Sequence, residues 1–149
     1  MERPKTHTLQ TSVSSRTFPA DRTAPRATAT WLRSQPTGLT PTRLADAELC
    51  TDELVTNVVR HAWTSDDTGP RSLTLRVERN DSEVEITIED AGVAFDPTAA
   101  PIAPIARTLE ESLPGGRGLL LVRAVAPRVA YERRNGVNRT TIAFPVETA

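Results

Sequence analysis

Two pairs of alternating segments constrain the fold of this chain more than any other feature. In the first pair, residues 73–77 and 84–88 alternate apolar and polar side chains across a short polar turn. In the second pair, residues 129–133 and 139–146 flank Asn135-Gly136, a dipeptide typical of tight hairpin turns. Alternation places the apolar side chains of a strand on one face. The sequence therefore predicts two antiparallel hairpins, each with one face suited to a core.

Three other segments carry signals of helices. Apolar residues recur at helical spacing over about 42–63, which predicts the main helix. A first helix is expected over about 21–34, with Asp21 as its N-cap. A third is expected over 116–126, where it begins with glycines and stops at Pro127.

The remaining segments complete the expected architecture. Sparse apolar residues and frequent threonines over 8–18 are typical of an edge strand. Residues 91–114 contain four prolines, which exclude a long regular element but allow a short helix over 105–113. Loops of this length are typically functional lids or disordered.

The order of these segments predicts the fold class. Strands come in antiparallel pairs rather than alternating with single helices, which favours an α+β fold. We expect a two-layer sandwich with a mixed, mostly antiparallel sheet and helices on one face. The length of 149 residues suits a single domain over 8–149, after a disordered N-terminus of residues 1–7.

Composition bounds the function classes. The net charge is −1, from 18 basic and 19 acidic residues, so no global field draws the chain to nucleic acid or membrane. The single cysteine, Cys50, cannot form an internal disulfide, which fits a reducing cytoplasm. An apolar signal segment and a stretch long enough to span a membrane are both lacking. We expect a soluble, cytoplasmic protein with no direct nucleic-acid or membrane contact.

The main helix carries the first chemical signal. Glu53 and Asn57 are four residues apart, so their side chains lie one above the other on one helical face. A carboxylate can accept a proton, and a carboxamide oxygen can ligate a hard cation such as Mg²⁺. Helices often carry a polar stripe, so the pair alone is a weak indication.

The second signal follows the strand over 84–88. Asp90 at the strand end can accept a hydrogen bond from an exocyclic amine, and Gly92 lets the backbone approach a flat ligand closely. The alternative is an ordinary Asp-x-Gly turn, which is very common.

The third signal is the glycine-rich start of the third helix. Glycines there expose backbone N–H groups at the positive end of the helix dipole, which favours an anion, and Arg117 can add a charge-assisted contact. No Lys-Ser or Lys-Thr follows, so this is not a Walker loop, and the following hairpin excludes a Rossmann fingerprint. The alternative is a flexible connection.

In this order, the three segments resemble the motif boxes of the Bergerat-type ATP-binding fold of gyrase, chaperone ATPases and histidine kinases. The resemblance covers about residues 44–146 and implies ATP and Mg²⁺ as ligands. It implies that Asp90 binds the adenine amino group with Gly92 beneath the base. It also implies that Asn57 ligates the Mg²⁺ that bridges the phosphates.

The same resemblance implies further nucleotide contacts. Thr140 matches a threonine that holds adenine through a water molecule, and because Thr141 points to the opposite face, only one of the two can serve. Arg60 is either a phosphate-binding cation or a solvated surface arginine. Phe95 either pins the lid or fills the core. The residues expected to hold the phosphate-side lid are Gly116, Arg117, Gly118 and Leu119.

A finer match is to the anti-sigma regulatory serine kinases. It rests on Glu-Leu-Val-Thr-Asn over 53–57 with His61-Ala62, on Phe95-Asp96-Pro97 and on Gly-Gly-Arg-Gly-Leu over 115–119. Such proteins bind a sigma factor and phosphorylate an anti-sigma antagonist on serine, which implies that Glu53 is the catalytic base. Related proteins dimerise through the N-terminal strand, so a homodimer is expected.

Two other functions compete with this interpretation. One is an anti-sigma or scaffold module that binds ATP as a structural ligand with little or no phosphoryl transfer. The other is a histidine-kinase-like fragment, which is disfavoured because the only histidines are His7 and His61. His61 is expected to make a structural hydrogen bond at the helix end.

Overall fold

A computed structural model of the chain describes residues 11–65, 67–99 and 116–147, apart from the side chains of residues 116 and 117. The predicted disordered segment 1–7 and the predicted short helix 105–113 lie outside these ranges. The elements, in chain order, are β1 (Ser12–Pro19), α1 (Ala24–Arg33), α2 (Pro41–His61), β2 (Ser72–Arg79), β3 (Glu83–Asp90), α3 (Gly116–Val125), β4 (Arg128–Arg134) and β5 (Val137–Pro145).

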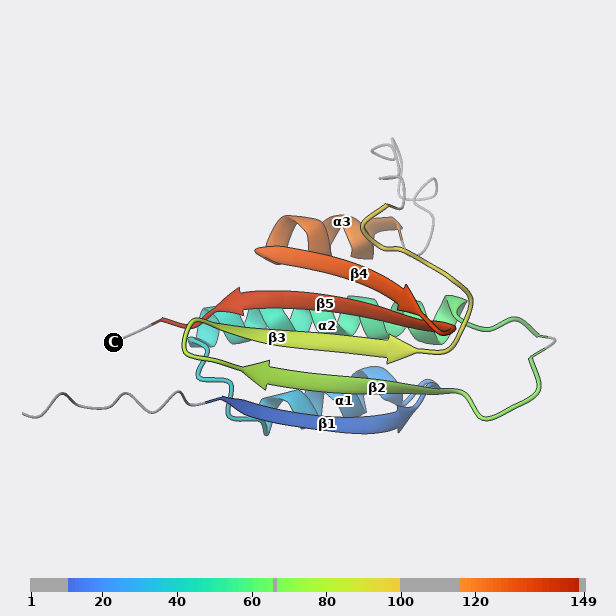
Figure 1. The fold of residues 1–149 in the computed structure, drawn as a ribbon, viewed down its shortest axis with the longest axis horizontal. Helices are drawn as coiled ribbons and strands as arrows, with labels where there is room; N and C mark the ends of the chain where they lie inside the picture. The colour runs from blue at the N-terminus through green and yellow to red at the C-terminus, as the bar shows by residue number, and fades with distance from the viewer. Residues whose placement is uncertain (1–10, 66, 100–115, 148–149) are drawn as a thin grey trace, which may run out of the picture.

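The strands form one sheet in the order β1-β2-β3-β5-β4 (Figure 1). Each neighbouring pair in the described sheet is antiparallel, so the sheet is not mixed as the sequence suggested. The reason is the place of β5. It lies between β3 and β4, the two strands that would otherwise meet in parallel after the crossover through α3. The α+β class and both predicted hairpins are confirmed.

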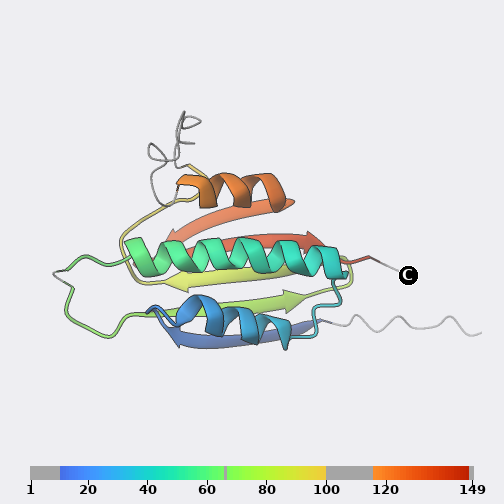
Figure 2. The ribbon, with the colours of Figure 1, turned by 180° about the vertical axis from the view of Figure 1, so that it is seen from behind.

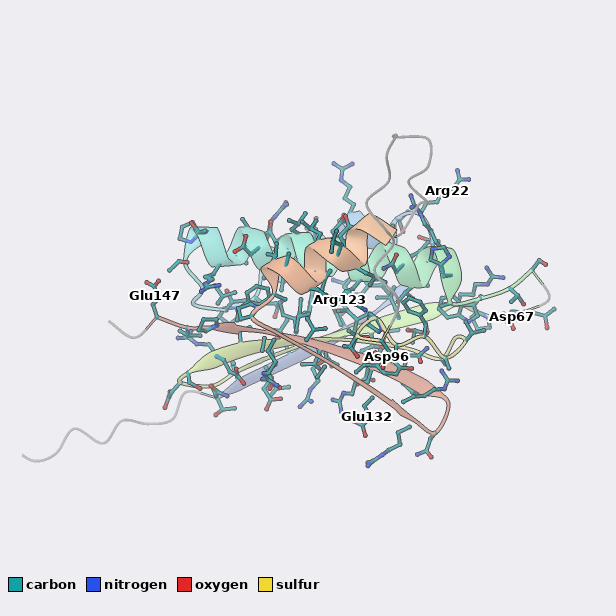
Figure 3. The ribbon with its side chains drawn as sticks, turned by 90° about the horizontal axis from the view of Figure 1, so that it is seen from above. Arg22, Asp67, Asp96, Arg123, Glu132 and Glu147 are labelled. Atoms are coloured by element: carbon teal, nitrogen blue, oxygen red, sulfur yellow. The ribbon has the colours of Figure 1, made fainter. Side chains whose placement is uncertain are left out.

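The helices cover one face of the sheet, as predicted (Figure 2). Between the two layers lies a core of fully buried apolar side chains, the largest being Phe144, Leu32, Leu73, Leu75, Ile86 and Ile88. The opposite face is polar and carries cross-strand threonine pairs, such as Thr87 and Thr141, whose Oγ1 atoms lie 3.1 Å apart. Glu132 points away from the helix layer on that side (Figure 3).

Helix starts follow local chemistry. Helix α2 begins after Thr40, whose Oγ1 accepts from Arg43 N at 3.2 Å. The predicted N-cap of α1 was wrong: Thr23 occupies that position. Asp21 Oδ1 instead accepts from Thr23 N at 2.8 Å, which closes a turn one step earlier. Pro25 explains the shift, because proline is tolerated only in the first turn of a helix.

The predicted main helix over 42–63 is observed over Pro41–His61, so its register is that expected from the sequence. It runs along the middle of the sheet between α1 and α3 (Figure 2). Within the described ranges, no helix combines the length and hydropathy needed to cross a membrane.

Candidate functional site

A pocket opens between the C-terminal half of α2 and the ends of β3 and β5. Its empty volume is about 530 Å³, a figure that includes space open to solvent. The residues that line it are Leu54, Asn57, Val58, His61, Ala62, Ile88, Asp90, Val93, Phe95, Pro97, Asn138 and Thr140. Residues of the main-helix motif and of the Asp-x-Gly motif therefore meet here with Thr140 of β5, whereas no described residue of the glycine-rich start of α3 lines the pocket.

One helical face of α2 supplies the polar wall of the pocket. Asn57 and His61 line the pocket one turn apart. Asn57 Nδ2 is buried and has no hydrogen-bond partner within the described structure. An orphaned buried amide is costly unless a ligand completes its bonding, so Asn57 fits a ligand-binding position.

Asp90 lies at the end of β3 and is 8% exposed. Its Oδ1 accepts two hydrogen bonds, from Gly92 N at 2.9 Å and from Asn138 Nδ2 at 3.1 Å. In the described ranges no group donates to Oδ2 of this pocket-lining residue. Asp90 therefore retains one acceptor for a donor on a ligand, such as an exocyclic amine.

Close packing against the end of α2 explains why residue 92 is a glycine, and the sequence did not reveal this contact. A Cβ atom at Gly92 would lie 2.3 Å from Ala62 O, and Val93 N donates to the same oxygen at 2.8 Å. The turn after β3 is thus pressed against the end of α2. Gly92 is not among the lining residues of the pocket, so its predicted place beneath a base stays a prediction.

Glu53 of α2 lies against the glycine-rich start of α3. A Cβ atom at Gly118 would lie 2.2 Å from Glu53 Oε2, so the carboxylate rests directly against this glycine. Glu53 makes no hydrogen bond or ion pair with any described residue. The backbone of Gly116 and Arg117 belongs to the first turn of α3. Leu119 packs against the core and does not line the pocket.

The two candidate threonines of β5 face opposite sides. Thr140 is buried and lines the pocket, whereas Thr141 Oγ1 lies 3.1 Å from Thr87 Oγ1 on the open face of the sheet. Alternation along the strand explains the difference. Thr140 is therefore the only one of the two that can reach a pocket ligand.

The outer wall of the pocket is formed by the segment after Gly92. Phe95 lines the pocket and is 43% exposed, so it is not a core residue. Asp96 Oδ1 accepts from Thr98 N at 2.8 Å, and Arg123 Nε of α3 donates to Pro97 O at 3.0 Å (Figure 3). The hydrogen bond from Arg123 thus connects this wall of the pocket to α3.

Arg60 does not line the pocket. Its side chain is exposed on α2 and forms no ion pair with a described residue. Its position agrees with the solvated alternative, and a phosphate contact for Arg60 stays a prediction.

Two lining residues have a different place in the site from the one expected from the sequence. The structural hydrogen bond expected of His61 is not found among the described residues, where the helix end is closed by Ala62 N, which donates to Val58 O. Asn138 was not considered at all. It shares the inward face of β5 with Thr140 and Ile142, and a polar residue at an apolar position is the signal that would have found it.

The donor set bears on which metal the site suits. The described residues contain no group of three or more His, Cys, Asp or Glu side chains that would hold a metal. Mg²⁺ typically takes one or two protein oxygens together with phosphate oxygens and water, so Asn57 alone fits such an ion bound with a nucleotide.

Burial, aided by Asp46 and Glu53, raises the pKa of the Cys50 thiol to about 11. Cys50 is therefore protonated at neutral pH and is neither a ligand nor a nucleophile.

Comparison with known proteins identifies the family. The sequence-family model of the histidine kinase-like ATPase domain matches residues 18–144. The chain belongs to this family. Family membership confirms the Bergerat-type resemblance and agrees with the pocket on α2, β3 and β5.

Individual relatives show which members of the family this chain resembles. The chain is 44% identical over 94 residues to the serine/threonine-protein kinase BtrW of Bordetella bronchiseptica, covering 63% of this chain and 65% of the relative. It is 28% identical over 102 residues to the serine-protein kinase RsbW of Bacillus subtilis, covering 67% and 64%. The matched stretch thus spans slightly less than two thirds of each relative's length.

A solved structure supports the fold. The crystal structure of the RsbU and RsbW domains of Rv1364c from Mycobacterium tuberculosis aligns with a TM-score of 0.58 at 17% identity. The alignment covers 89% of this chain and 32% of that chain. At this identity the likeness concerns the fold alone.

Proposed function

We propose that this chain is an ATP-dependent protein kinase that phosphorylates a serine of an anti-sigma antagonist and also binds a sigma factor. The observation that carries the proposal is the place of Glu53. Its carboxylate, which has no partner among the described residues, rests against Gly118 at the start of α3, one helical turn from Asn57 and the pocket. The names of the two relatives, a serine/threonine-protein kinase and a serine-protein kinase, support the same activity.

Each part of the pocket has a role in this scheme. Asp90 Oδ2 accepts from the adenine amino group, and Thr140 holds the base from β5. Asn57 would hold Mg²⁺ through its amide oxygen, and the ion would neutralise phosphate charge. The backbone N–H groups at the start of α3 face the phosphates.

Glu53 serves as the base. The serine oxygen attacks the γ-phosphorus, the bond to the bridging oxygen breaks and ADP leaves, while the serine proton passes to the Glu53 carboxylate. Positioned proton transfer of this kind contributes about 10²–10⁴-fold to a rate. A module that only binds ATP has no need of a proton-accepting carboxylate in this place.

The runner-up function is an ATP-binding anti-sigma module with little phosphoryl transfer. One observation favours it: no Lys or Arg occurs among the described lining residues to stabilise the transferring phosphate. Incubation with Mg²⁺, γ-labelled ATP and a candidate antagonist separates the two. We expect label on an antagonist serine, whereas tight ATP binding with no labelled antagonist would leave only the binding module.

A homodimer and a cytoplasmic location remain part of the proposal. Strand β1 pairs with β2 on one side and with no described strand on the other. Such an edge offers unpaired backbone groups that a second copy can satisfy. The exposed side chain of Val13 on β1 is consistent with a contact there.

The role of Asp90 gives a direct prediction for the base site. Asp90→Asn replaces the free acceptor Oδ2 by a group that can donate, so ATP binding should weaken by about 1–3 kcal/mol. Isothermal calorimetry measures the change. Glu89→Gln is the matched control, because Glu89 lies one residue away on the open face and pairs with Arg139. Equal affinities for Asp90→Asn and the control would remove Asp90 from the site.

A further inference from the structure

Asn138 has a fully bonded side chain at the pocket, and the proposed function gives it no role. Its Nδ2 donates to Asp90 Oδ1 at 3.1 Å and to Val93 O at 2.7 Å. Its Oδ1 accepts from Arg133 Nη1 at 2.8 Å and from the Tyr131 hydroxyl. Asn138 is 4% exposed and lines the pocket.

The chemistry of these partners fixes the orientation of the Asn138 amide. The Asp90 carboxylate and the Val93 carbonyl can only accept, and the Arg133 guanidinium can only donate. Exchanging the amide N and O would therefore oppose donor to donor and acceptor to acceptor at these three contacts. Asn138 holds a single orientation that ties β5 to the turn after β3.

This arrangement decides which oxygen of Asp90 remains available. Asn138 and Asp90 are cross-strand partners in the β3–β5 register. Together with Gly92 N at 2.9 Å, Asn138 occupies Oδ1 of Asp90 from two directions. Two fixed donors on one oxygen restrict rotation of the carboxylate, so Oδ2 keeps a defined direction.

The same network holds the turn that carries Asp90. Arg133 Nη1 donates to Gly92 O at 3.1 Å, and Val93 is bonded to Ala62 O through its N and to Asn138 through its O. The wall of the pocket is thus anchored to both β4 and α2. Loss of Asn138 removes one of the two bonds that orient Asp90 but leaves in place the bond from Gly92 N to Asp90 and the bond from Val93 N to Ala62 O.

We propose that Asn138 is a positioning residue that determines base specificity by aiming Asp90 Oδ2 at a 6-amino group. The site then takes 6-aminopurine nucleotides and rejects 6-oxopurines, whose oxygen would oppose the carboxylate with a second acceptor. Asn138 acts through Asp90 and not on the base itself. This inference rests on the proposed binding of ATP.

The test removes the 6-amino group from the ligand and Asn138 from the protein. Calorimetry would compare ATP with purine riboside 5′-triphosphate, which lacks the amino group. We expect wild type to prefer ATP by about tenfold or more, the scale of one well-placed hydrogen bond to a charged group. Asn138→Ala should reduce this preference to about twofold by weakening ATP binding, with the affinity for the analogue nearly unchanged.

Further variants keep the test decisive if Asn138→Ala does not fold. Tyr131→Phe keeps the ring and removes one bond to Asn138, so it should lower the preference for ATP by about threefold. Thr141→Val, on the opposite face of β5, is the matched control and should keep the wild-type preference.

The outcomes are distinguishable. Equal weakening of both nucleotides in Asn138→Ala would mean a structural role or a direct contact with the rest of the base, and would overturn the inference. An unchanged preference in Asn138→Ala, or in Tyr131→Phe should the first variant not fold, would overturn it as well. If wild type binds neither nucleotide, both the proposed function and this inference are wrong.

Discussion

Glu53→Gln should abolish most phosphoryl transfer while leaving nucleotide binding intact. The amide has the size of the carboxylate but cannot take the proton of a serine hydroxyl, so the rate should fall by about 10²–10⁴-fold. The carboxylate has no partner among the described residues, so its replacement leaves no buried group unpaired. Single-turnover transfer of labelled phosphate to the antagonist gives the rate, and calorimetry gives the affinity for ATP.

The matched control for Glu53→Gln is Asp52→Asn, the same change of charge on the neighbouring exposed position of α2. It should transfer phosphate at the wild-type rate. If Glu53→Gln is as fast as this control, Glu53 is not the base and the module that only binds ATP becomes the better description. If both nucleotide affinity and rate collapse together, Glu53 supports the pocket and takes no part in proton transfer.

Gly92→Ala should damage both stability and nucleotide binding. The added Cβ would lie 2.3 Å from Ala62 O and 2.5 Å from Ala62 Cβ, so either the end of α2 or the turn after β3 must move. Overpacking of this kind typically costs about 1–3 kcal/mol of unfolding free energy. Because Val93 and Asp90 share that turn, the base wall of the pocket moves with it.

Chemical denaturation would measure the stability of Gly92→Ala, and calorimetry its affinity for ATP. Gly69→Ala is the control, since a Cβ there meets nothing within 4 Å. Wild-type stability and affinity in Gly92→Ala would show that the close contact with Ala62 relaxes freely. The tight packing of this turn would then have no bearing on the pocket.

The helices and strands could be predicted from the sequence because their signals are local. Alternation within two hairpins and the helical spacing before His61 report on neighbours along the chain, and the observed bounds of α2 follow them closely. The start of α1 was misplaced because Asp21 and Thr23 are both good caps, and only Pro25 decides between them. The antiparallel sheet depends on the insertion of β5 between β3 and β4, a long-range choice that no local pattern carries.

The candidate site was foreseen in part for the same reason. Asn57, Asp90 and Thr140 carry recognisable motifs, and the structure brings all three to one pocket. Asn138 was missed because its importance lies in bonds to Asp90, Arg133 and Tyr131, which become neighbours only when the sheet forms. Contacts such as that of Gly92 with Ala62 also join segments far apart in the chain.

The pocket exists only while distant parts of the chain remain assembled, since Asn57 comes from α2, Asp90 from β3 and Thr140 from β5. A nucleotide that binds this assembly and not the unfolded chain stabilises it by mass action, by about 2.7 kcal/mol at a hundred times its dissociation constant. Protease resistance of the purified chain should then rise with nucleotide concentration, because cleavage requires the opened chain.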